Sequence, residues 1–393
     1  MCGTTLRTTR FEALAVDRTL VDFYGSPAWA GYARQPALTV LDLDKARSEG
    51  RYGDGVIVAV IDNGIDPDDA VLKDVLLPGY DFTRNQAGAS EWLDLDSATV
   101  TALTTSSCAG DLTQSSAAIM DGTSTSVLTQ STAAIMDGCQ AAVVTQSTAA
   151  IMDASTVDQL ESLPPLPADF GHGTIVAGLI HAVAPRARIL PIKAFRADGT
   201  GRASDVTQAI YYAINRGARI INMSFTFSSK SEEVMFATAL AALTGRILVA
   251  ASGNEGLVVQ RWPAEHRWVV GVCSTTLGDA RSTFSNQGYD TCKLGAPGEN
   301  LITPYPGNHY ASVSGTSFSA ALVSGAAALM TSSASTLDWG VTDAVVESAP
   351  FAEISNIVRD SDNRYPRRLI IPPAVDLAAI LQKTTIKRIN NIR

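Results

Sequence analysis

Four short apolar runs, separated by helix-like stretches, limit what this chain can fold into. The runs cover residues 56–61, 189–195, 220–223 and 247–251. Continuous apolar character over so few residues is typical of a strand that is covered on both faces. Helix-like stretches at 204–216 and 232–244 end near Gly217 and Gly245, as helices often do. This alternation predicts an α/β fold with a mostly parallel sheet flanked by helices.

The composition excludes several classes of protein. The 393 residues are 46% hydrophobic and 18% charged, which is ordinary for a globular chain. A net charge of −9 argues against nucleic acid as the main partner. No apolar run reaches the ~18 residues that a membrane-spanning helix needs, so no membrane partner is expected. The first ten residues are polar and lack the apolar core of a signal peptide.

Charge is distributed unevenly along the chain. Between Arg84 and Arg186 there is no lysine or arginine, while ten acidic residues lie there. That segment carries −10, and the remainder of the chain is nearly neutral at +1. Such a break usually marks an inserted element. We predict an acidic insertion at 85–168 inside a domain that spans 51–385, with an N-terminal extension at 1–50 and a tail at 386–393.

The insertion contains a repeat with a period of 16 residues. Three copies, LTQSSAAIMDG, LTQSTAAIMDG and VTQSTAAIMDA, begin at Leu112, Leu128 and Val144, and the repeats cover 112–159. Repeat units bury their apolar faces on one another, so short hairpins or a small solenoid are one interpretation. Low-complexity sequence without fixed structure is the other. The repeats contain no nucleophile–base pair, and we expect no catalysis there.

Four motifs contain residues suited to catalysis, and two of them lie in the first half of the chain. Asp62 directly follows the first apolar run, and parallel sheets place their active sites at the carboxyl ends of strands. His172 lies in Gly-His-Gly-Thr, where small neighbours let an imidazole face a cleft. Each has a plainer interpretation, because Asp-Asn-Gly also forms turns and a single histidine is more often a packed or surface residue.

The other two motifs lie in the second half. Asn254 follows the fourth apolar run in a Gly-rich turn, from which an amide can donate a hydrogen bond to a developing oxyanion. Ser317 precedes an Ala-rich apolar helix, whose N-terminal N–H groups favour negative charge. The plainer interpretations are a turn asparagine that bonds local backbone and an N-cap serine.

Taken together, the four motifs indicate a family far more specifically than any one of them does. Their order, Asp62, His172, Asn254 and Ser317, resembles that of the subtilisin-like serine protease family, the subtilases. Segments at 221–225, 262–264, 282–286, 294–298 and 368–379 are also similar to family segments. The resemblance covers roughly 53–381, apart from about 85–168. It implies a three-layer fold around a mostly parallel central sheet.

The resemblance implies a serine endopeptidase that works through an acyl-enzyme. His172 would take the proton of Ser317, Asp62 would fix the imidazole tautomer, and Asn254 with the N–H of Ser317 would form the oxyanion hole. Family members bind polypeptide substrates as an added strand. The matching residues are Gly199, Thr200, Gly201, Ser224, Phe225, Thr226, Ala251, Ser252 and Gly253. Of these, 251–253 would line the pocket for the substrate residue before the scissile bond. A further hypothesis is that Glu255, at the rim of that pocket, favours a basic substrate side chain there.

The resemblance implies no cofactor, and we expect no metal site. The short span from His172 to Pro185 leaves no room for the calcium-binding loop that interrupts this helix in many relatives. Thr226 stands where the family has glycine, which predicts a narrower cleft.

The acidic insertion is a candidate site for a protein partner or inhibitor, or a gate over the cleft. Localisation is left open, because no signal peptide is visible whereas the family is largely secreted. The five cysteines form neither a disulfide framework nor a CxxC site, although Cys273 and Cys292 are candidates for pairing across neighbouring strands.

The main alternative is a catalytically silent subtilase-fold scaffold that presents the acidic repeats to a partner. Retention of all four chemical groups argues against it. An esterase or lipase is disfavoured because Ser317 lacks a Gly-x-Ser-x-Gly motif.

Overall fold

The computed structural model describes residues 17–105, 132–135, 141–142, 151–152, 166–288, 290–332 and 367–368. Most of the repeats, the predicted closing helix within 368–379 and the predicted tail at 386–393 lie outside the described residues. The domain boundaries that we expect from the sequence stay predictions.

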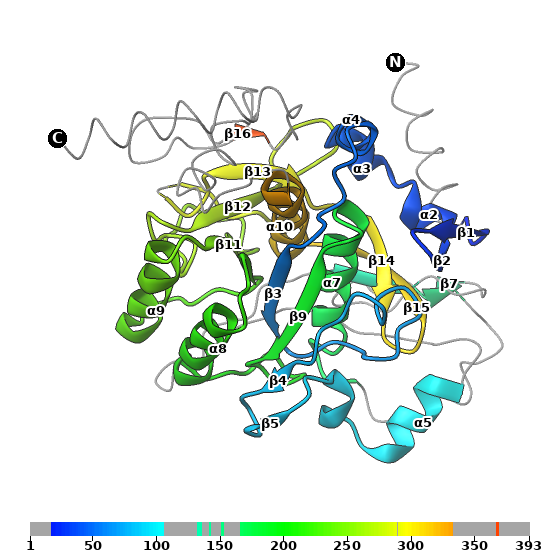
Figure 1. The fold of residues 1–393 in the computed structure, drawn as a ribbon, viewed down its shortest axis with the longest axis horizontal. Helices are drawn as coiled ribbons and strands as arrows, with labels where there is room; N and C mark the ends of the chain where they lie inside the picture. The colour runs from blue at the N-terminus through cyan, green and yellow to red at the C-terminus, as the bar shows by residue number, and fades with distance from the viewer. Residues whose placement is uncertain are drawn as a thin grey trace.

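A nine-stranded sheet forms the centre of the described part of the chain (Figure 1). In spatial order its strands are β16 (Arg367–Arg368), β13 (Leu294–Pro297), β12 (Val270–Thr275), β11 (Ile247–Ala251), β10 (Ile220–Met223), β3 (Ile57–Asp62), β9 (Arg188–Lys193), β4 (Tyr80–Asp81) and β5 (Gln86–Ala87). Every neighbouring pair is parallel except β4 with β5. The four predicted strands are β3, β9, β10 and β11, which are adjacent at the centre. The prediction of a mostly parallel sheet is therefore confirmed.

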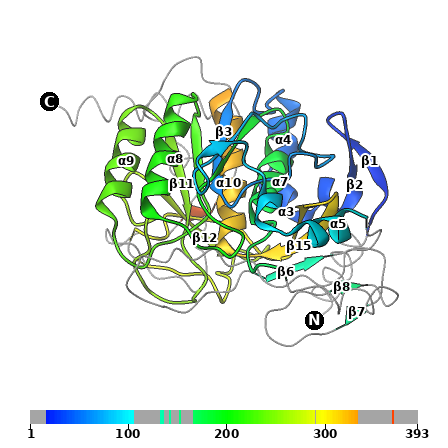
Figure 2. The same cartoon turned by 90° about the horizontal axis from the view of Figure 1, so that it is seen from below.

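Helices cover both faces of this sheet (Figures 1 and 2). α7 (His172–Val183) and α10 (Thr316–Ser332) pack on one face, and α8 (Ala203–Asn215) and α9 (Glu232–Leu243) pack on the other. Side chains alternate along β3: Val58 and Val60 join the core under α7 and α10, whereas Ala59 and Ile61 join the core under α8 and α9. This two-sided burial explains the continuous apolar runs in the sequence.

α8 and α9 end close to the glycines that the sequence indicated. Gly217 and Gly245 have φ of +77° and +81°, a left-handed backbone that glycine adopts without steric cost. The predicted helix ends are thus within two residues of the observed ones.

A second, antiparallel sheet lies beside the main one. It contains β14 (Leu301–Tyr305), β15 (His309–Ser314) and β6 (Thr132–Ile135), with β15 in the middle. β6 belongs to the second repeat copy. β7 (Ala141–Ala142) pairs with β8 (Ile151–Met152), and ahead of the repeats lie η1 (Glu91–Asp94) and α5 (Ser97–Thr105). The described part of the repeats therefore forms short strands.

The described part of the N-terminal extension crosses α7 and β14. It contains β1 (Leu20–Phe23), β2 (Ser26–Trp29), α2 (Ala30–Ala33), α3 (Pro36–Val40) and α4 (Leu43–Ser48). The hydroxyl of Tyr32 donates to the carbonyl of Gly178 (2.8 Å). The Gln35 amide exchanges two hydrogen bonds with the backbone of Ile302 (2.8 and 3.0 Å). These contacts hold the extension against the domain.

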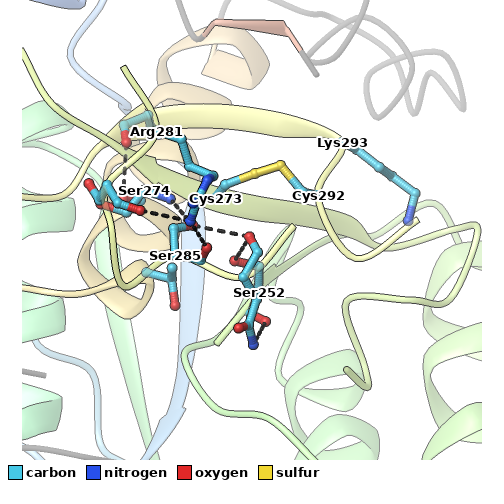
Figure 3. Close-up of a disulfide and its surroundings, with 12 residues drawn as sticks. Ser252, Cys273, Ser274, Arg281, Ser285, Cys292 and Lys293 are labelled. Atoms are coloured by element: carbon cyan, nitrogen blue, oxygen red, sulfur yellow. Dashed lines mark hydrogen bonds between the residues drawn. A yellow bond between two sulfur atoms is a disulfide. The ribbon is translucent and has the colours of Figure 1, made fainter. Parts of the chain in front are cut away.

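Cys273 of β12 and Cys292, just before β13, form a disulfide (Figure 3). Their Cα atoms are 5.4 Å apart, a usual separation for a disulfide. Both residues are buried. The pairing that the sequence left open is therefore present.

Candidate active site

Asp62 lies at the carboxyl end of β3, near the middle of the main sheet. Its side chain is buried, and Oδ1 accepts a hydrogen bond from the N–H of Asn63 (2.8 Å). The neighbouring strands β10 and β9 end at the same edge because all three run parallel. This is the position that open α/β sheets use for active sites.

His172 is the first residue of α7 and its ring is buried against Asp62. Nδ1 lies 2.8 Å from Oδ1 and 3.0 Å from Oδ2 of Asp62. Gly173 makes this approach possible, because a Cβ there would lie 1.9 Å from the carbonyl oxygen of Gly64. The N–H of Gly173 also donates a hydrogen bond to Oδ1 of Asn63 (3.0 Å). The glycine after the histidine is therefore required by the contact between α7 and the loop after β3.

Two opposing effects act on the pKa of His172. Burial works to lower the pKa, whereas the Asp62 carboxylate raises it through its charge and hydrogen bond, and Asp169 adds a further raising effect. The net result is a pKa above the ordinary value. Because Nδ1 must donate to a carboxylate, Nε2 is left as the basic nitrogen of the neutral ring.

Ser317 is the second residue of α10, directly after β15 and Gly315. Its hydroxyl donates to the carbonyl of Ser224 (3.1 Å), and Nε2 of His172 is buried without a hydrogen-bond partner among the described residues. The ring of His172 lies 5.7 Å from that of Phe318, the residue after the serine. The structure thus joins Asp62 to His172 and places Ser317 in the adjoining helix, while the bond between Ser317 and His172 is not formed. Rotation about χ1 of Ser317 gives Oγ other staggered positions.

Asn254 follows β11 and is held by the residue before Ser317. Its Oδ1 accepts from the N–H of Thr316 (2.9 Å) and from the Thr316 hydroxyl (2.8 Å). A backbone N–H can only donate, so the oxygen of the amide is the atom facing Thr316. The amide NH₂ therefore faces away from Thr316.

The predicted substrate-binding residues follow the same edge of the sheet. Ser224 comes after β10, and its hydroxyl donates to the carbonyl of Ser317 (2.9 Å). Thr226 is partly exposed, whereas Phe225 is 2% exposed and packs against Phe195 (ring centroids 4.8 Å apart). The side chain of Phe225 therefore belongs to the core, and this residue offers only its backbone.

The remaining predicted binding residues lie in two loops. Gly201 forms an isolated antiparallel bridge with Phe195, and Thr200 donates its N–H to Oδ1 of Asp198 (2.9 Å). Gly199 in the same loop has φ of +79°. On the other side, the N–H of Gly253 donates to Oγ1 of Thr316 (3.1 Å). These loops follow β9 and β11, and β10, the strand that Ser224 follows, lies between those two strands in the sheet.

Ala251 and Ser252, the other two predicted binding residues, lie beside Gly253. Ala251 ends β11, and the N–H of Ser252 donates to the carbonyl of Val272 on β12 (2.9 Å). The Ser252 hydroxyl donates to the carbonyl of Asn286 (3.3 Å). Both residues are buried.

Glu255 is already paired. Its Oε1 lies 2.8 Å from Nη2 and 2.9 Å from Nε of Arg261, and its Oε2 accepts from the Asn286 amide. Both oxygens therefore have cationic or amide partners. This arrangement weighs against the hypothesis that Glu255 attracts a basic substrate side chain.

Sequence reasoning missed three residues next to Asp62 and His172: Glu91, Asp94 and Lys193. All three are buried or nearly so, although Glu91 and Asp94 lie in the segment predicted as an insertion. Lys193 gave a weak signal, since it is a charged residue inside an apolar run.

In the part of the chain that the structure describes, no group of three or more His, Cys, Asp or Glu side chains has an arrangement that would hold a metal ion. Across the same residues, each helix is too short or too polar to cross a membrane.

Fold and site together define the class of protein: a three-layer α/β protein with an aspartate–histidine pair at the carboxyl edge of a parallel sheet. The same fold is found in a solved cold-adapted subtilisin-like serine proteinase, with a TM-score of 0.57 and 21% identity over 82% of this chain and 90% of the other. The sequence model of the subtilase family matches residues 53–363. The chain belongs to the subtilase family.

Two curated relatives show closer similarity over a shorter region. A thermostable alkaline protease of Halalkalibacterium halodurans is 38% identical over 171 residues, 41% of this chain and 47% of the relative. Subtilisin BL of Lederbergia lenta is 38% identical over 169 residues, 41% of this chain and 62% of the relative. These matches span less than two thirds of either relative.

Proposed function

We propose that this chain is a serine endopeptidase in which Asp62, His172 and Ser317 form a catalytic triad. The observation that carries the proposal is the bond from Nδ1 of His172 to Asp62, which leaves Nε2 as a base beside the helix that begins at Thr316. Nε2 takes the proton of Ser317 as Oγ attacks the scissile carbonyl, and the imidazolium then protonates the leaving amine. Water hydrolyses the acyl-enzyme by the same proton transfers. Substrates are polypeptides.

The oxyanion of the tetrahedral intermediate is bound by the Asn254 amide and the N–H of Ser317. Support comes from the Thr316 contacts that fix the amide oxygen, so the amide donor is oriented before substrate arrives. Gly199, Thr200 and Gly201 on one side and Ser224, Phe225 and Thr226 on the other bind the substrate backbone as an added strand. Ala251, Ser252 and Gly253 line the pocket for the residue before the scissile bond.

Activity on a denatured protein tests this proposal. Wild-type protein should cleave denatured casein, and Ser317→Ala should lower the rate at least ~1000-fold. Ser312→Ala, on β15, is the matched control and should keep wild-type activity. A folded wild-type chain that leaves casein intact, or a Ser317→Ala variant as active as wild type, would instead favour a silent scaffold that presents the repeats.

The acidic repeats act on access to this site. Support comes from β6 of the second repeat, which pairs with β15 from Ala311↔Ile135 to Thr132↔Ser314, three residues before Ser317. Replacing residues 107–164 by a short Gly-Ser linker should raise the cleavage rate of casein more than that of a small peptide. Equal rates before and after replacement, for both substrates, would exclude a gating role. The same variant, used in a pull-down, tests whether a protein partner binds the repeats.

The disulfide favours an oxidising compartment as the site of folding. Disulfides form and persist in secreted proteins and are rare in the cytosol. Alkylation of free thiols in freshly isolated protein should therefore spare Cys273 and Cys292. Modification of both by the alkylating reagent would place the protein in a reducing compartment.

A further inference from the structure

Glu91 contacts the helix that begins with His172. The hydroxyl of Thr174, two residues after His172, donates to Oε1 of Glu91 and accepts from the N–H of Asp66 (2.8 Å). Glu91 is fully buried, and within the part of the chain that the structure describes its Oε2 has no hydrogen-bond partner. The Thr174 hydroxyl therefore links α7 to the loop that follows Asp62, and the Glu91 carboxyl accepts the hydrogen of that hydroxyl.

The backbone around Glu91 is packed against that same loop. The N–H of Ile65 donates to the carbonyl of Ala89 (2.8 Å), and a Cβ on Gly64 would lie 2.6 Å from the N of Glu91. Gly64 has φ of +108°, a conformation that favours glycine. Residues 89–91 thus pack directly against the loop after Asp62, and they leave no space for a side chain at position 64.

Asp94 contacts Lys193, the residue that pairs with Asp62 on the neighbouring strand β9. Its Oδ2 accepts from Nζ of Lys193 (2.6 Å) and from the N–H of Ala197 (2.7 Å). Lys193 pairs with Asp62 across β3 and β9, and its Nζ also donates to the carbonyl of Asn63 and to that of Phe195 (2.9 Å). All three donors of the ammonium group are used.

Lys193 depends on Asp94 for charge balance. Its side chain is fully buried, and that of Asp94 is only 7% exposed. A buried ammonium without a carboxylate partner is strongly unfavourable. The carbonyl of Asn63, next to Asp62, is therefore held by a cation whose counter-charge comes from the segment predicted as an insertion.

We propose that Glu91 and Asp94 are positioning residues for the Asp62–His172 pair: Glu91 fixes the start of α7 through Thr174, and Asp94 fixes the end of β3 through Lys193 and Asn63. This proposal rests on the proposed function. Residues 91–94 are then part of the catalytic domain, and only the chain beyond them is available for an accessory role.

The charged groups around His172 allow the role of Asp94 to be tested through the pKa of His172. Asp62 on β3 and Asp169 ahead of α7 both stabilise the imidazolium. Behind Asp62 lie Lys193 on β9, Asp94 on η1 and Glu91, whose pKa burial raises well above its usual range. Asp94 also pairs with Arg84 (2.5 Å), which keeps Asp81 as a partner (3.2 Å) when Asp94 is neutralised, whereas Lys193 is left unbalanced. The extra positive charge disfavours the imidazolium. The pKa of His172 should therefore fall.

The experiment measures two quantities in wild type, Asp94→Asn, and Asp94→Asn combined with Lys193→Met. One is the pKa of His172, from an NMR titration assigned with His172→Ala; the other is kcat and KM on a small peptide. Asp94→Asn should lower the pKa by about half a unit or more, the size of effect an unbalanced buried charge produces. The double variant should regain the wild-type pKa but keep a lowered kcat, because Asn63 is no longer held.

Glu91 is tested with a conservative and a non-conservative change. Glu91→Gln keeps an acceptor for Thr174 and should stay within about threefold of the wild-type kcat. Glu91→Ala should lower kcat about 10-fold or more with KM unchanged, because misplacing a catalytic group costs that much. Asp96→Asn changes an exposed carboxylate five residues further along the chain and is the matched control.

The outcomes separate this proposal from the proposed function. An unshifted His172 pKa in folded Asp94→Asn, together with wild-type kcat in Glu91→Ala, overturns the positioning role. A wild-type chain without peptidase activity overturns the proposed function alone, since the NMR titration still tests Asp94.

Discussion

Nδ1 of His172 lies 2.8 Å from Oδ1 of Asp62, although 110 residues separate the two along the chain. The contact forms because the start of α7 meets the carboxyl end of β3, with glycine at position 173 where the backbones are closest. A long excursion between two such points costs little, at roughly 0.6 kcal/mol for each doubling of loop length. Sequence separation is therefore no obstacle to this pair.

The pH dependence of peptide hydrolysis should reflect the environment of His172. The imidazole must be neutral to act as a base, and Asp62 outweighs burial to raise its pKa. We expect kcat/KM to increase with pH with an apparent pKa above about 6.5. Asp62→Asn should move this rise in kcat/KM to lower pH and reduce kcat by about 10⁴-fold. An apparent pKa below the ordinary histidine value, or one that Asp62→Asn leaves unchanged, would disprove this interpretation.

Removing the Asn254 amide should slow the chemical step more than it weakens binding. Asn254→Leu should lower kcat ~100- to 1000-fold with a small change in KM, a magnitude established on a subtilisin, which is a member of this family. Thr316→Val removes one hydrogen bond to Oδ1 of Asn254 and should cause a smaller loss. Steady-state kinetics on one peptide test both, and a larger loss for Thr316→Val would argue against this role.

The Glu255–Arg261 pair should suppress any preference for basic residues before the scissile bond. Wild type is expected to cleave after leucine as well as after lysine, because Arg261 balances Glu255. Arg261→Ala should raise the lysine-to-leucine ratio of kcat/KM several-fold, consistent with a partly exposed charge pair worth about 1 kcal/mol. Arg261→Ala combined with Glu255→Gln serves as the control and should return the ratio to the wild-type value. A peptide panel varied at this residue measures all three.

The fold class and the order of the site motifs could be predicted because their signals are local. Buried parallel strands read as continuous apolar runs, and the turns after Asp62 and before Ser317 carry their own short motifs. The positions of Glu91 and Asp94 could not be predicted, because acidic residues in a lysine-free segment give no sign of burial. Their partners, Thr174 and Lys193, are 83 and 99 residues away.

The same limit applies to residues whose role depends on a neighbour in space. The sequence places Phe225 in the binding strand but does not reveal that its ring packs on Phe195. Nor does it show that Arg261 neutralises Glu255. In both cases the residue type was recognised and its contacts were not, since contacts depend on how loops pack.

His181 should make the fold less stable in acid. Burial lowers its pKa to about 4, and no described residue forms a hydrogen bond with either ring nitrogen. The unfolded chain binds the proton from about pH 6.5 downward, whereas the native state does so only near pH 4. Stability from this group is therefore complete above about 6.5 and lost as pH falls towards 4, by about 3 kcal/mol.

Urea unfolding in a Ser317→Ala background avoids self-digestion and measures this effect. Between about pH 7 and about pH 5, His181→Leu should show a smaller decrease in unfolding free energy than the same background with His181 retained. Parallel losses in the two proteins would assign the acid sensitivity to other groups.

The most direct test of the triad is covalent labelling with a fluorophosphonate, followed by mass spectrometry of the labelled peptide. We expect one adduct per chain, located on Ser317, which forms in wild type and in Ser312→Ala and is lost in His172→Ala. An adduct on another residue, or labelling of Ser317 that does not depend on His172, would contradict the catalytic role assigned to these side chains.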